Sequence, residues 1–468
     1  MGKKSTMAAC LLAEFLGSFF LIFTVGMNVL VKDAVWGGIS IGSVLMVSVY
    51  ALGGISGANF NPAVTFALAL VEFIGGPVKG FLFKKLFMYW GAQIAGGIAG
   101  GFCYRAVFDH GIQLGPQDVK FGAADVGILE IIYTFMLCFV VLNVAVAQEN
   151  QPNQYFGIAI GGVIFAGAYG AGAVCGGCFN PAVALGLDIS HINHFYPKWS
   201  PFYVLCQLMA GALAAGCFRL VRSSNFPGGN KETSEGARLL SEFLGTFMLV
   251  LTVGLNVLAK SPAGAYSIAS SLMSMIYALG SVSGAHFNPA VTLAVYLTGR
   301  TSELTPMRVA GYVGAQMIAG KLAAMTYTSV YSGQAFPLGP GEGYGMEALG
   351  IVEVAFTLLL SYVVLAVAVS TTTNSSNKFG FCIGACVTVG GNAGGPISGG
   401  AFNPAVAFGI GSAAGPFQHT IVMVLTYWVF QFVGGALAAL LFRVTHAADL
   451  ENEAEPPADD SARLMKPV

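Results

Sequence analysis

The residues best suited to do chemistry in this chain lie in four copies of an Asn-Pro-Ala-Val sequence, each preceded by phenylalanine and followed by an apolar run. Asparagine is a good helix N-cap, because its side-chain oxygen accepts hydrogen bonds from N–H groups of the first turn. Proline suits the first helical position, where its missing N–H is not needed. Alanine is small enough to let two such loops touch. The motif residues are Asn61, Pro62, Ala63, Asn180, Pro181, Ala182, Asn288, Pro289, Ala290, Asn403, Pro404 and Ala405.

The apolar run after each motif is about ten residues long, as in PAVTFALALV from Pro62. Ten helical residues rise about 15 Å, which is about half the hydrocarbon thickness of a bilayer. The motifs therefore predict half-helices that enter a membrane from opposite faces and meet near its midplane. There the asparagine NH2 groups would face the lumen and donate to a solute, while the positive helix ends oppose cations and protons. Backbone carbonyls of the approaching loops, Gly53–Asn59 and Gly172–Phe179, would add acceptors. The pattern is typical of a path for small neutral molecules.

The composition agrees with a membrane location for these elements. Only 9% of the residues are charged and 55% are hydrophobic, with a mean hydropathy of +0.72, whereas about 25% of a soluble domain is charged. The net charge of -1 gives no sign of a nucleic-acid partner, and nine cysteines, mostly in apolar segments, do not suggest a disulfide framework.

Spans of about 20 apolar residues are expected for helices that cross a bilayer. In the first half they are predicted at about Met7–Val31, Ala34–Gly54, Lys85–Phe108, Asp125–Ala147, Tyr155–Val174 and Pro201–Leu220. In the second half they are predicted at about Ala237–Ala259, Ala265–Ser281, Met307–Tyr331, Glu347–Val369, Phe379–Gly395 and Ile421–Val444.

The two halves are copies of one another. SEFLGTFMLVLTVGLNVLAK from Ser241 repeats AEFLGSFFLIFTVGMNVLVK from Ala13, and the motif spacing is nearly the same in both halves. The predicted domains are a first module (1–222), a polar cytoplasmic linker (223–236), a second module (237–446) and an acidic, disordered tail (447–468). Most lysines and arginines fall on the side of both termini, which indicates that the termini are cytoplasmic.

In these motifs and in its internal repeat, the chain resembles two members of the major intrinsic protein, or aquaporin, family fused head to tail. The similarity runs from Ala13 to Val444 except for the linker, and it includes the GAQ sequences at Gly91 and Gly314. It implies an all-α integral membrane fold: two hourglass modules, each with six transmembrane helices and two half-helices in an inverted repeat, twelve spans in total. It also implies a passive channel, not an enzyme, with no cofactor, catalytic residue or metal site.

Four glutamates lie inside apolar spans, where a carboxylate is costly and usually has a role. They could relay protons. The resemblance implies instead that they accept hydrogen bonds from the loop backbone and hold the half-helices in place. These residues are Glu14, Glu130, Glu242 and Glu353.

The outer constriction departs from the family pattern, in which an arginine usually follows the second Asn-Pro-Ala. Here that position is valine in both modules, and the resemblance assigns small or aliphatic residues to the other constriction positions. A wider and less polar gate would admit glycerol, urea, ammonia or hydrogen peroxide; alternatively, another group refills the gap and the pore selects water. The constriction residues are Ile41, Ala168, Gly177 and Val183, and Ile268, Gly391, Gly400 and Val406.

Several single residues have more than one interpretation. The Cys175/Cys178 pair suits mercurial block better than redox or metal chemistry, and His286 is either a pH sensor or a hydrogen-bonded loop residue. Lys321 lies within a span and either extends to the interface or pairs with a carboxylate. Tyr427–Trp428 suggests packing or an interface anchor.

Two other classes of function remain open at this point. One is a twelve-span secondary transporter of a small solute, and the other is a closed or scaffolding membrane protein. The chain's partners would be the lipid bilayer and small neutral solutes, with a homodimer forming a four-pore assembly in the plasma membrane or an internal membrane.

Overall fold

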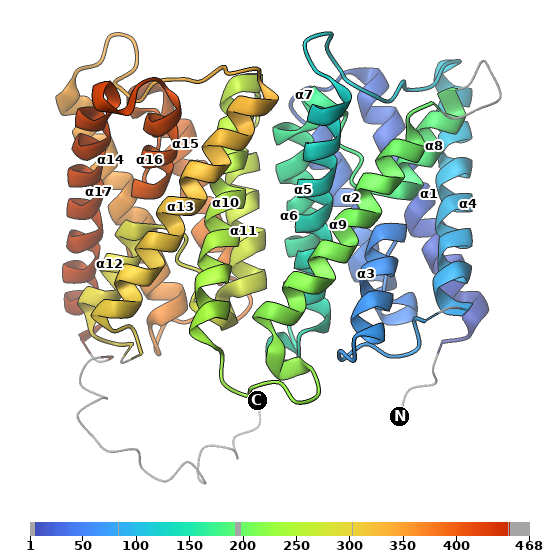
Figure 1. The fold of residues 1–468 in the computed structure, drawn as a ribbon, viewed down its shortest axis with the longest axis horizontal. Helices are drawn as coiled ribbons and strands as arrows, with labels where there is room; N and C mark the ends of the chain where they lie inside the picture. Colours follow the sequence, from blue (N-terminus) through green and yellow to red (C-terminus); the bar gives the residue numbers. More distant parts are fainter. Residues whose placement is uncertain (1–4, 83, 192–197, 302, 448, 450–468) are drawn as a thin grey trace.

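The computed structural model describes residues 5–447 and 449, apart from 83, 192–197 and 302. In this part the chain is all-helical, and Figure 1 shows two bundles side by side, blue to green and green to red. Residues 450–468, most of the tail predicted to be disordered, lie outside the described residues.

The first bundle contains the six long helices and two half-helices predicted for a module. The last turn of α5 continues as a π-turn, Leu142–Val146, and a single turn, α7 (Gly172–Cys175), follows α6. The helices are α1 (Met7–Val31), α2 (Gly37–Ser56), α3 (Pro62–Phe73), α4 (Lys84–Phe108), α5 (Ala123–Val141), α6 (Phe156–Gly170), α8 (Pro181–His191) and α9 (Ser200–Val221).

The second bundle repeats this order. A π-turn at Leu365–Val369 again follows the fourth long helix. The helices are α10 (Glu235–Ala259), α11 (Gly264–Ser283), α12 (Pro289–Thr298), α13 (Pro306–Val330), α14 (Met346–Val364), α15 (Phe379–Ser398), α16 (Pro404–Ala413) and α17 (Phe417–Thr445).

Helix ends repeat between the bundles as closely as helix order does. Thr6 caps α1 and Ser234 caps α10, each by accepting from the N–H three residues later. Lys32 and Lys260 end the same two helices in the left-handed conformation, with φ of 61° and 51°. The internal duplication predicted from sequence is therefore confirmed down to these capping residues.

Several boundaries differ from the prediction, and two of the differences lie next to the motif loops of the first module. α2 continues to Ser56, so the loop before the first motif begins at Gly57 and not at Gly53. The fifth span of the first module breaks at Ala171 into α6 and α7, whereas its counterpart α15 runs unbroken to Ser398. Fewer bare carbonyls therefore approach the motifs than expected.

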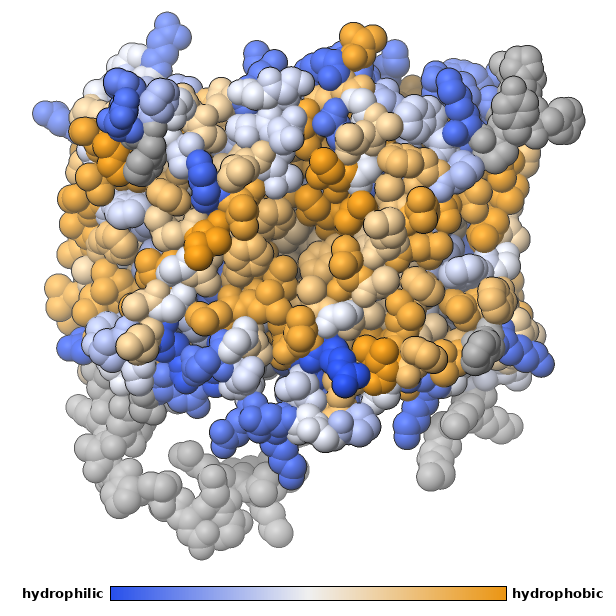
Figure 2. Space-filling view, in the orientation of Figure 1, coloured by the Kyte–Doolittle hydropathy of each residue, from blue (hydrophilic) through white to orange (hydrophobic). Residues whose placement is uncertain are grey.

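The outer surface carries the apolar belt of a membrane protein. On the face that Figure 2 shows, hydrophobic side chains cover the middle of the molecule and hydrophilic ones lie at both rims. By length and composition alone, eight of the described helices could cross a membrane. The other predicted spans, α4, α6, α13 and α15, lie among these helices in the two bundles.

Glycines let the half-helices approach the long helices closely. A Cβ on Gly97 of α4 would lie 2.6 Å from the carbonyl oxygen of Ala182 on α8, and a Cβ on Gly320 of α13 would lie 2.6 Å from that of Ala405 on α16. Both distances are too short for any side chain. Close packing through small residues is typical of membrane helices, and it explains much of the high glycine content.

The two bundles pack through α5 and α6 of the first against α10 and α11 of the second. Serine hydroxyls cross this interface: Ser267 donates to the carbonyl of Ala166 at 2.9 Å, and Ser274 to that of Ala159 at 2.8 Å. Such bonds give polar groups a partner within the apolar surroundings.

A buried arginine closes the interface on the side of the linker. Arg222 ends α9 and donates to the carbonyl of Ala278 on α11 at 2.8 Å and to Oδ1 of Asn143 at 3.0 Å. Its guanidinium also lies 3.6 Å from Glu149. Arg222 thus joins the first module to the second.

Candidate functional site

Each half-helix begins as its sequence suggests. In the first module Asn61 is extended, with φ −153°, and its Oδ1 accepts from the N–H of Ala63 at 2.8 Å, with Pro62 at the first helical position. Asn180 accepts from Ala182 in the same way at 2.9 Å. Asn288 and Asn403 repeat this arrangement in the second module. The four asparagines therefore fix where the half-helices start.

The asparagine NH2 groups do more than face a lumen. Asn61 Nδ2 donates to the carbonyl of Phe179 at 2.9 Å, and Asn180 Nδ2 donates back to that of Phe60 at 2.8 Å. An amide NH2 has two hydrogens, so one ties the loops together and one remains for a solute. The bond between the loops was not predicted from the sequence, and the expectation that the NH2 groups face the lumen stays a prediction.

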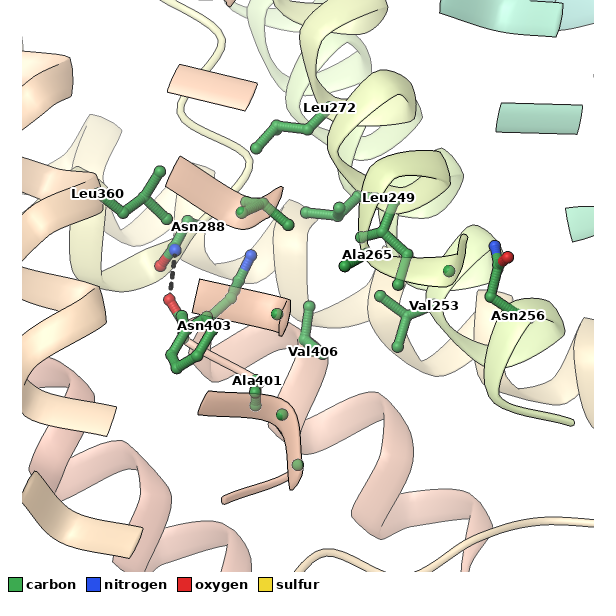
Figure 3. A pocket seen from close by; sticks show the side chains of 18 of the residues that line it. Leu249, Val253, Asn256, Ala265, Leu272, Asn288, Leu360, Ala401, Asn403 and Val406 are labelled. Carbon is green, nitrogen blue, oxygen red and sulfur yellow. Dashed lines mark hydrogen bonds between the residues drawn. The ribbon is translucent and has the colours of Figure 1, made fainter. Parts of the chain in front are cut away.

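The second module uses the same exchange. Asn288 donates to Phe402 at 2.9 Å and Asn403 to Phe287 at 2.8 Å, and Figure 3 shows the two asparagines close together on facing half-helices. The paired half-helices of each module thus meet through reciprocal side-chain-to-backbone bonds.

A strained phenylalanine precedes each asparagine. Phe60, Phe179, Phe287 and Phe402 all have a positive φ between 47° and 51°, a conformation that costs about 1–3 kcal/mol in a residue other than glycine. The strain turns the chain so that the N–H groups of the loop point into the protein. Something must hold these N–H groups for the turn to persist.

The buried glutamates hold them. Glu14 accepts from the N–H of Asn59 at 3.0 Å and of Phe60 at 2.8 Å, and also from Gln93 at 2.8 Å. The other glutamates accept from the corresponding groups, and all four are fully buried. With these donors on the carboxylate oxygens, the geometry supports the loop-holding role over a proton relay.

The predicted constriction residues differ between the two modules in the cavity that they line. In the second module Ile268, Gly391, Gly400 and Val406 all line one cavity of about 480 Å³. In the first module Ile41, Gly177 and Val183 line a cavity of about 30 Å³.

Ala168 is not among the residues that line the smaller cavity. It packs instead toward Gly38, where an added Cβ would lie 3.1 Å from its own. Among the described residues lining the two cavities there is no arginine.

These features are shared with a known family of membrane proteins. The model of the major intrinsic protein family matches residues 1–186, 145–260 and 256–442. The chain belongs to the major intrinsic protein family. It is thus an integral, multi-pass membrane channel and not an enzyme, and its matches recur along the chain as expected for a duplicated channel.

Relatives of this major intrinsic protein match about half of it at a time. A "Probable aquaporin NIP-type" of Nicotiana alata is 33% identical over 230 residues, covering 46% of this chain and 79% of the relative. Nodulin-26 of Glycine max is 31% identical over 243 residues, covering 49% and 83%. Among solved structures, the aquaglyceroporin of Plasmodium falciparum matches 47% of this chain and all of its own, with 19% identity and a TM-score of 0.41.

The role of several tyrosines and glutamines in holding the pore loops was not predicted from the sequence of this chain. Tyr89, Tyr203, Tyr312 and Tyr427 each donate to a carbonyl at the start of one motif loop. Gln207 and Gln431 bond Glu130 and Glu353 as Gln93 bonds Glu14. Each half-helix has one such tyrosine and one such glutamine, at matching positions in the two halves of the sequence. This repetition could have indicated their role.

Two of the open interpretations are now decided. Lys321 pairs with no carboxylate in the hydrogen bonds described: its Nζ donates to the carbonyl of Ser412, near the end of half-helix α16, at 3.0 Å. Tyr427 is buried and bonds the pore loop, and Trp428 donates to the carbonyl of Pro404 at 3.0 Å. Both aromatic residues therefore make the packing contacts that were one of the two interpretations.

His286 has a clear partner, whereas Cys175 and Cys178 are not joined to each other. His286 lies 3.2 Å from the hydroxyl of Thr292, and Asn59 holds the corresponding Thr65 at 3.1 Å. His286 and Asn59 therefore make equivalent hydrogen bonds to the threonine of the half-helix, which agrees with the interpretation of His286 as a hydrogen-bonded loop residue. Cys175 and Cys178 are free thiols, and Cys178 lines the cavity of the first module.

Proposed function

We propose that this chain is a passive channel for water and small neutral solutes such as glycerol, urea, ammonia and hydrogen peroxide. Its two pores run through the modules at 1–222 and 237–446. The observation that carries the proposal is the constriction with Val406: its lining is aliphatic or glycine, its cavity is about 480 Å³, and it has no arginine. At these four positions a solute larger than water meets neither a fixed charge nor a large side chain, although Lys260 and Phe336 also line the cavity.

Ion exclusion is assigned to the paired half-helices. Two helix N-termini converge on the midplane beside Asn288 and Asn403, and their partial positive charges repel cations and protons. A neutral solute instead accepts from the free amide hydrogen of each asparagine. This role needs no fixed charge at the constriction, which fits the absence of arginine among the residues that line the cavities.

The test is flux through the purified protein in liposomes. Glycerol and urea uptake are measured beside osmotic swelling, with Cys217→Ala, outside both cavities, as a reconstitution control. We expect solute uptake together with swelling, and a large loss of uptake in the double variant Val183→Arg/Val406→Arg. Fast swelling with no solute uptake would overturn the broad selectivity.

A homodimer with four pores is the proposed assembly. Within one chain, α10 and α11 cover α5 and α6, but the equivalent faces on α1 and α2 and on α14 and α15 lack this cover. In the apolar stretch of α11, 72% of the residues are buried, against 17% in its counterpart α2. Val47 and Val389, which are 53% and 51% exposed, lie on the uncovered helices.

A second copy related by a two-fold axis would repeat the internal contact on these faces. The native mass in detergent tests this: two chains are expected, and a single chain would contradict it.

Orientation and compartment complete the proposal. Figure 1 shows α1 beginning and α17 ending on one face of the bundles, and the surplus of lysine and arginine on that side supports cytoplasmic termini. The membrane is the plasma membrane or an internal one. Protease accessibility of an added terminal tag in sealed vesicles tests the orientation.

A further inference from the structure

The two modules have the same fold, but their pore cavities differ in size. The cavity of the second module holds about 480 Å³ and that of the first about 30 Å³. The larger cavity is lined by the counterparts of the residues around the smaller one, and it also extends to residues of the outer mouth such as Asn256, Lys260 and Phe336. A cavity needs about 10–15 Å³ of such accessible volume to hold one water molecule. The smaller cavity therefore accommodates water-sized molecules, whereas the larger one has room for a solute with several heavy atoms.

Two lining positions explain the difference near the motifs. Ile164 of α6 lines the small cavity, and Val387, at the same place in α15, lines the large one. Cys178 lines the small cavity just before its motif, where the second module has Ala401. At both positions the first module carries the bulkier side chain.

Two other differences do not widen the second pore. Gly391 replaces Ala168, but Ala265 replaces the facing Gly38, so the pair fills the same space between the helices. Ile276, the counterpart of Val49, is larger in the second module, and it lies about two helical turns along α11 from the constriction residue Ile268. The second cavity is therefore wider beside the motifs, and it also continues into the outer mouth.

The outer mouth of the first module also carries a brace that the second lacks. The hydroxyl of Tyr169 donates to the carbonyl of Val35 and accepts from the N–H of Ile39 at 3.1 Å, which joins α6 to the start of α2. Its counterpart Asn392 is exposed and bonds only its own helix in the bond described, at Thr388.

Gln117 adds to this difference. Its backbone N–H bonds Val174, as that of Gly341 bonds Ile397 in the second module, but only the first module has a side chain there. That side chain lies beside Gly176, within 3.4 Å of where its Cβ would be. The first mouth is braced and filled, and the second is open.

The second mouth also offers unpaired polar atoms. Asn256 Oδ1 and Ser261 Oγ, both among the lining residues, are buried without a hydrogen-bond partner in the described chain. In the first module the position of Ser261 is Asp33, whose carboxylate accepts from two backbone N–H groups of its own turn. Figure 3 shows Asn256 well apart from the Asn288–Asn403 pair, so a hydroxylated solute would meet it at a separate point on its path.

We propose that the chain divides its cargo: the second-module pore conducts polyol- and urea-sized solutes, and the first-module pore conducts only water-sized molecules. This rests on the proposed channel function. The residues that set the division are Ile164, Cys178, Tyr169 and Gln117, because each fills or braces the first pore where the second is open.

The experiment closes one pore at a time in the full chain, reconstituted in liposomes at matched protein content. Val406→Arg blocks the second constriction and Val183→Arg the first, and glycerol uptake and osmotic swelling are both recorded. We expect Val406→Arg to lower glycerol uptake at least tenfold while swelling persists. Val183→Arg should lower swelling and leave glycerol uptake within twofold. Equal loss of glycerol uptake in both variants would overturn the division.

A gain-of-function variant provides a second test of the proposal in case an arginine variant folds poorly. In the Val406→Arg background, the added changes Ile164→Val and Cys178→Ala enlarge the first pore, and we expect glycerol uptake to return. Cys206→Ala, a buried thiol outside both cavities, is the matched control and should not restore it. No return in a protein that still swells with water would contradict the proposal. A wild-type protein that swells but takes up no glycerol refutes the broad selectivity itself, which separates the two failures.

Discussion

Replacing Glu242 by glutamine tests whether the buried carboxylates hold the pore loops. Glu242 Oε1 accepts from the N–H of His286 at 3.0 Å, and Oε2 accepts from that of Phe287 at 2.7 Å. A glutamine keeps the shape but turns an NH2 toward one of these N–H groups. Ser283 and Gln316, the other partners, can reorient to accept from the new amide, whereas a backbone N–H cannot.

The expected loss of folding free energy follows from the hydrogen bonds that the substitution removes. One buried N–H without an acceptor costs about 1–3 kcal/mol, and the bonds that remain lose the contribution of the negative charge, for about 2–4 kcal/mol in total. Phe287, held at a φ of 50°, can then relax out of its strained turn. The half-helix α12 would lose its fixed start, and the second pore its shape.

The assay is chemical denaturation of the detergent-solubilised chain together with glycerol flux. We expect a lower denaturation midpoint and reduced flux for Glu242→Gln, and no change for Glu232→Gln, which is exposed in the linker. Glu14→Gln should lose similar stability, because Glu14 makes the same bonds. A normal midpoint combined with a changed proton permeability would refute the loop-holding role and favour a relay.

Three further predictions follow from other parts of the molecule. Gly97→Val should prevent stable folding, measured as loss of monodisperse protein in detergent, because its Cβ would lie 2.6 Å from the carbonyl of Ala182; Gly91→Ala, where an added Cβ meets nothing within 4 Å, is the control. A small thiol reagent entering the pores should slow water flux through Cys178, which lines the first cavity, and should lose this effect in Cys178→Ala; persistent block there would place the reaction elsewhere. Burial alone would raise the pKa of Glu149, but hydrogen bonds from Ser224 and Asn225 and the charge of Arg222 together lower it below 4.5. Its stabilisation is therefore present above about pH 4.5 and fades as the pH falls through the lowered pKa, so the difference in denaturation midpoint between wild type and Glu149→Gln should shrink at acid pH; a constant difference would contradict the assignment.

The sequence was sufficient for the parts of this molecule that depend on local chemistry. Asparagine followed by proline is a helix start in any surroundings, so the four half-helices could be placed, and duplication gave the second module from the first. The spans followed from hydropathy, with errors of a few residues where a helix such as α2 continued into the loop.

The features that could not be predicted from the sequence depend on contacts between segments that are far apart in the chain. The exchange of amide bonds between Asn61 and Asn180 requires knowing that one loop's carbonyl faces the other loop's amide, and no pattern states that. The brace from Tyr169 to the start of α2 and the anchor from Arg222 to Ala278 are of the same kind. The two cavities differ at lining side chains such as Ile164 and Val387 and in how far each extends toward the outer mouth, and both differences depend on which side chains face the lumen.

The most direct test of the central claim is the initial rate of glycerol uptake into liposomes containing the wild-type chain, measured over a wide range of glycerol concentrations with and without an imposed proton or sodium gradient. A passive channel predicts a rate that rises in proportion to concentration and does not change when the ion gradient is collapsed. Uptake that saturates and disappears with the gradient would identify a coupled transporter and contradict the account.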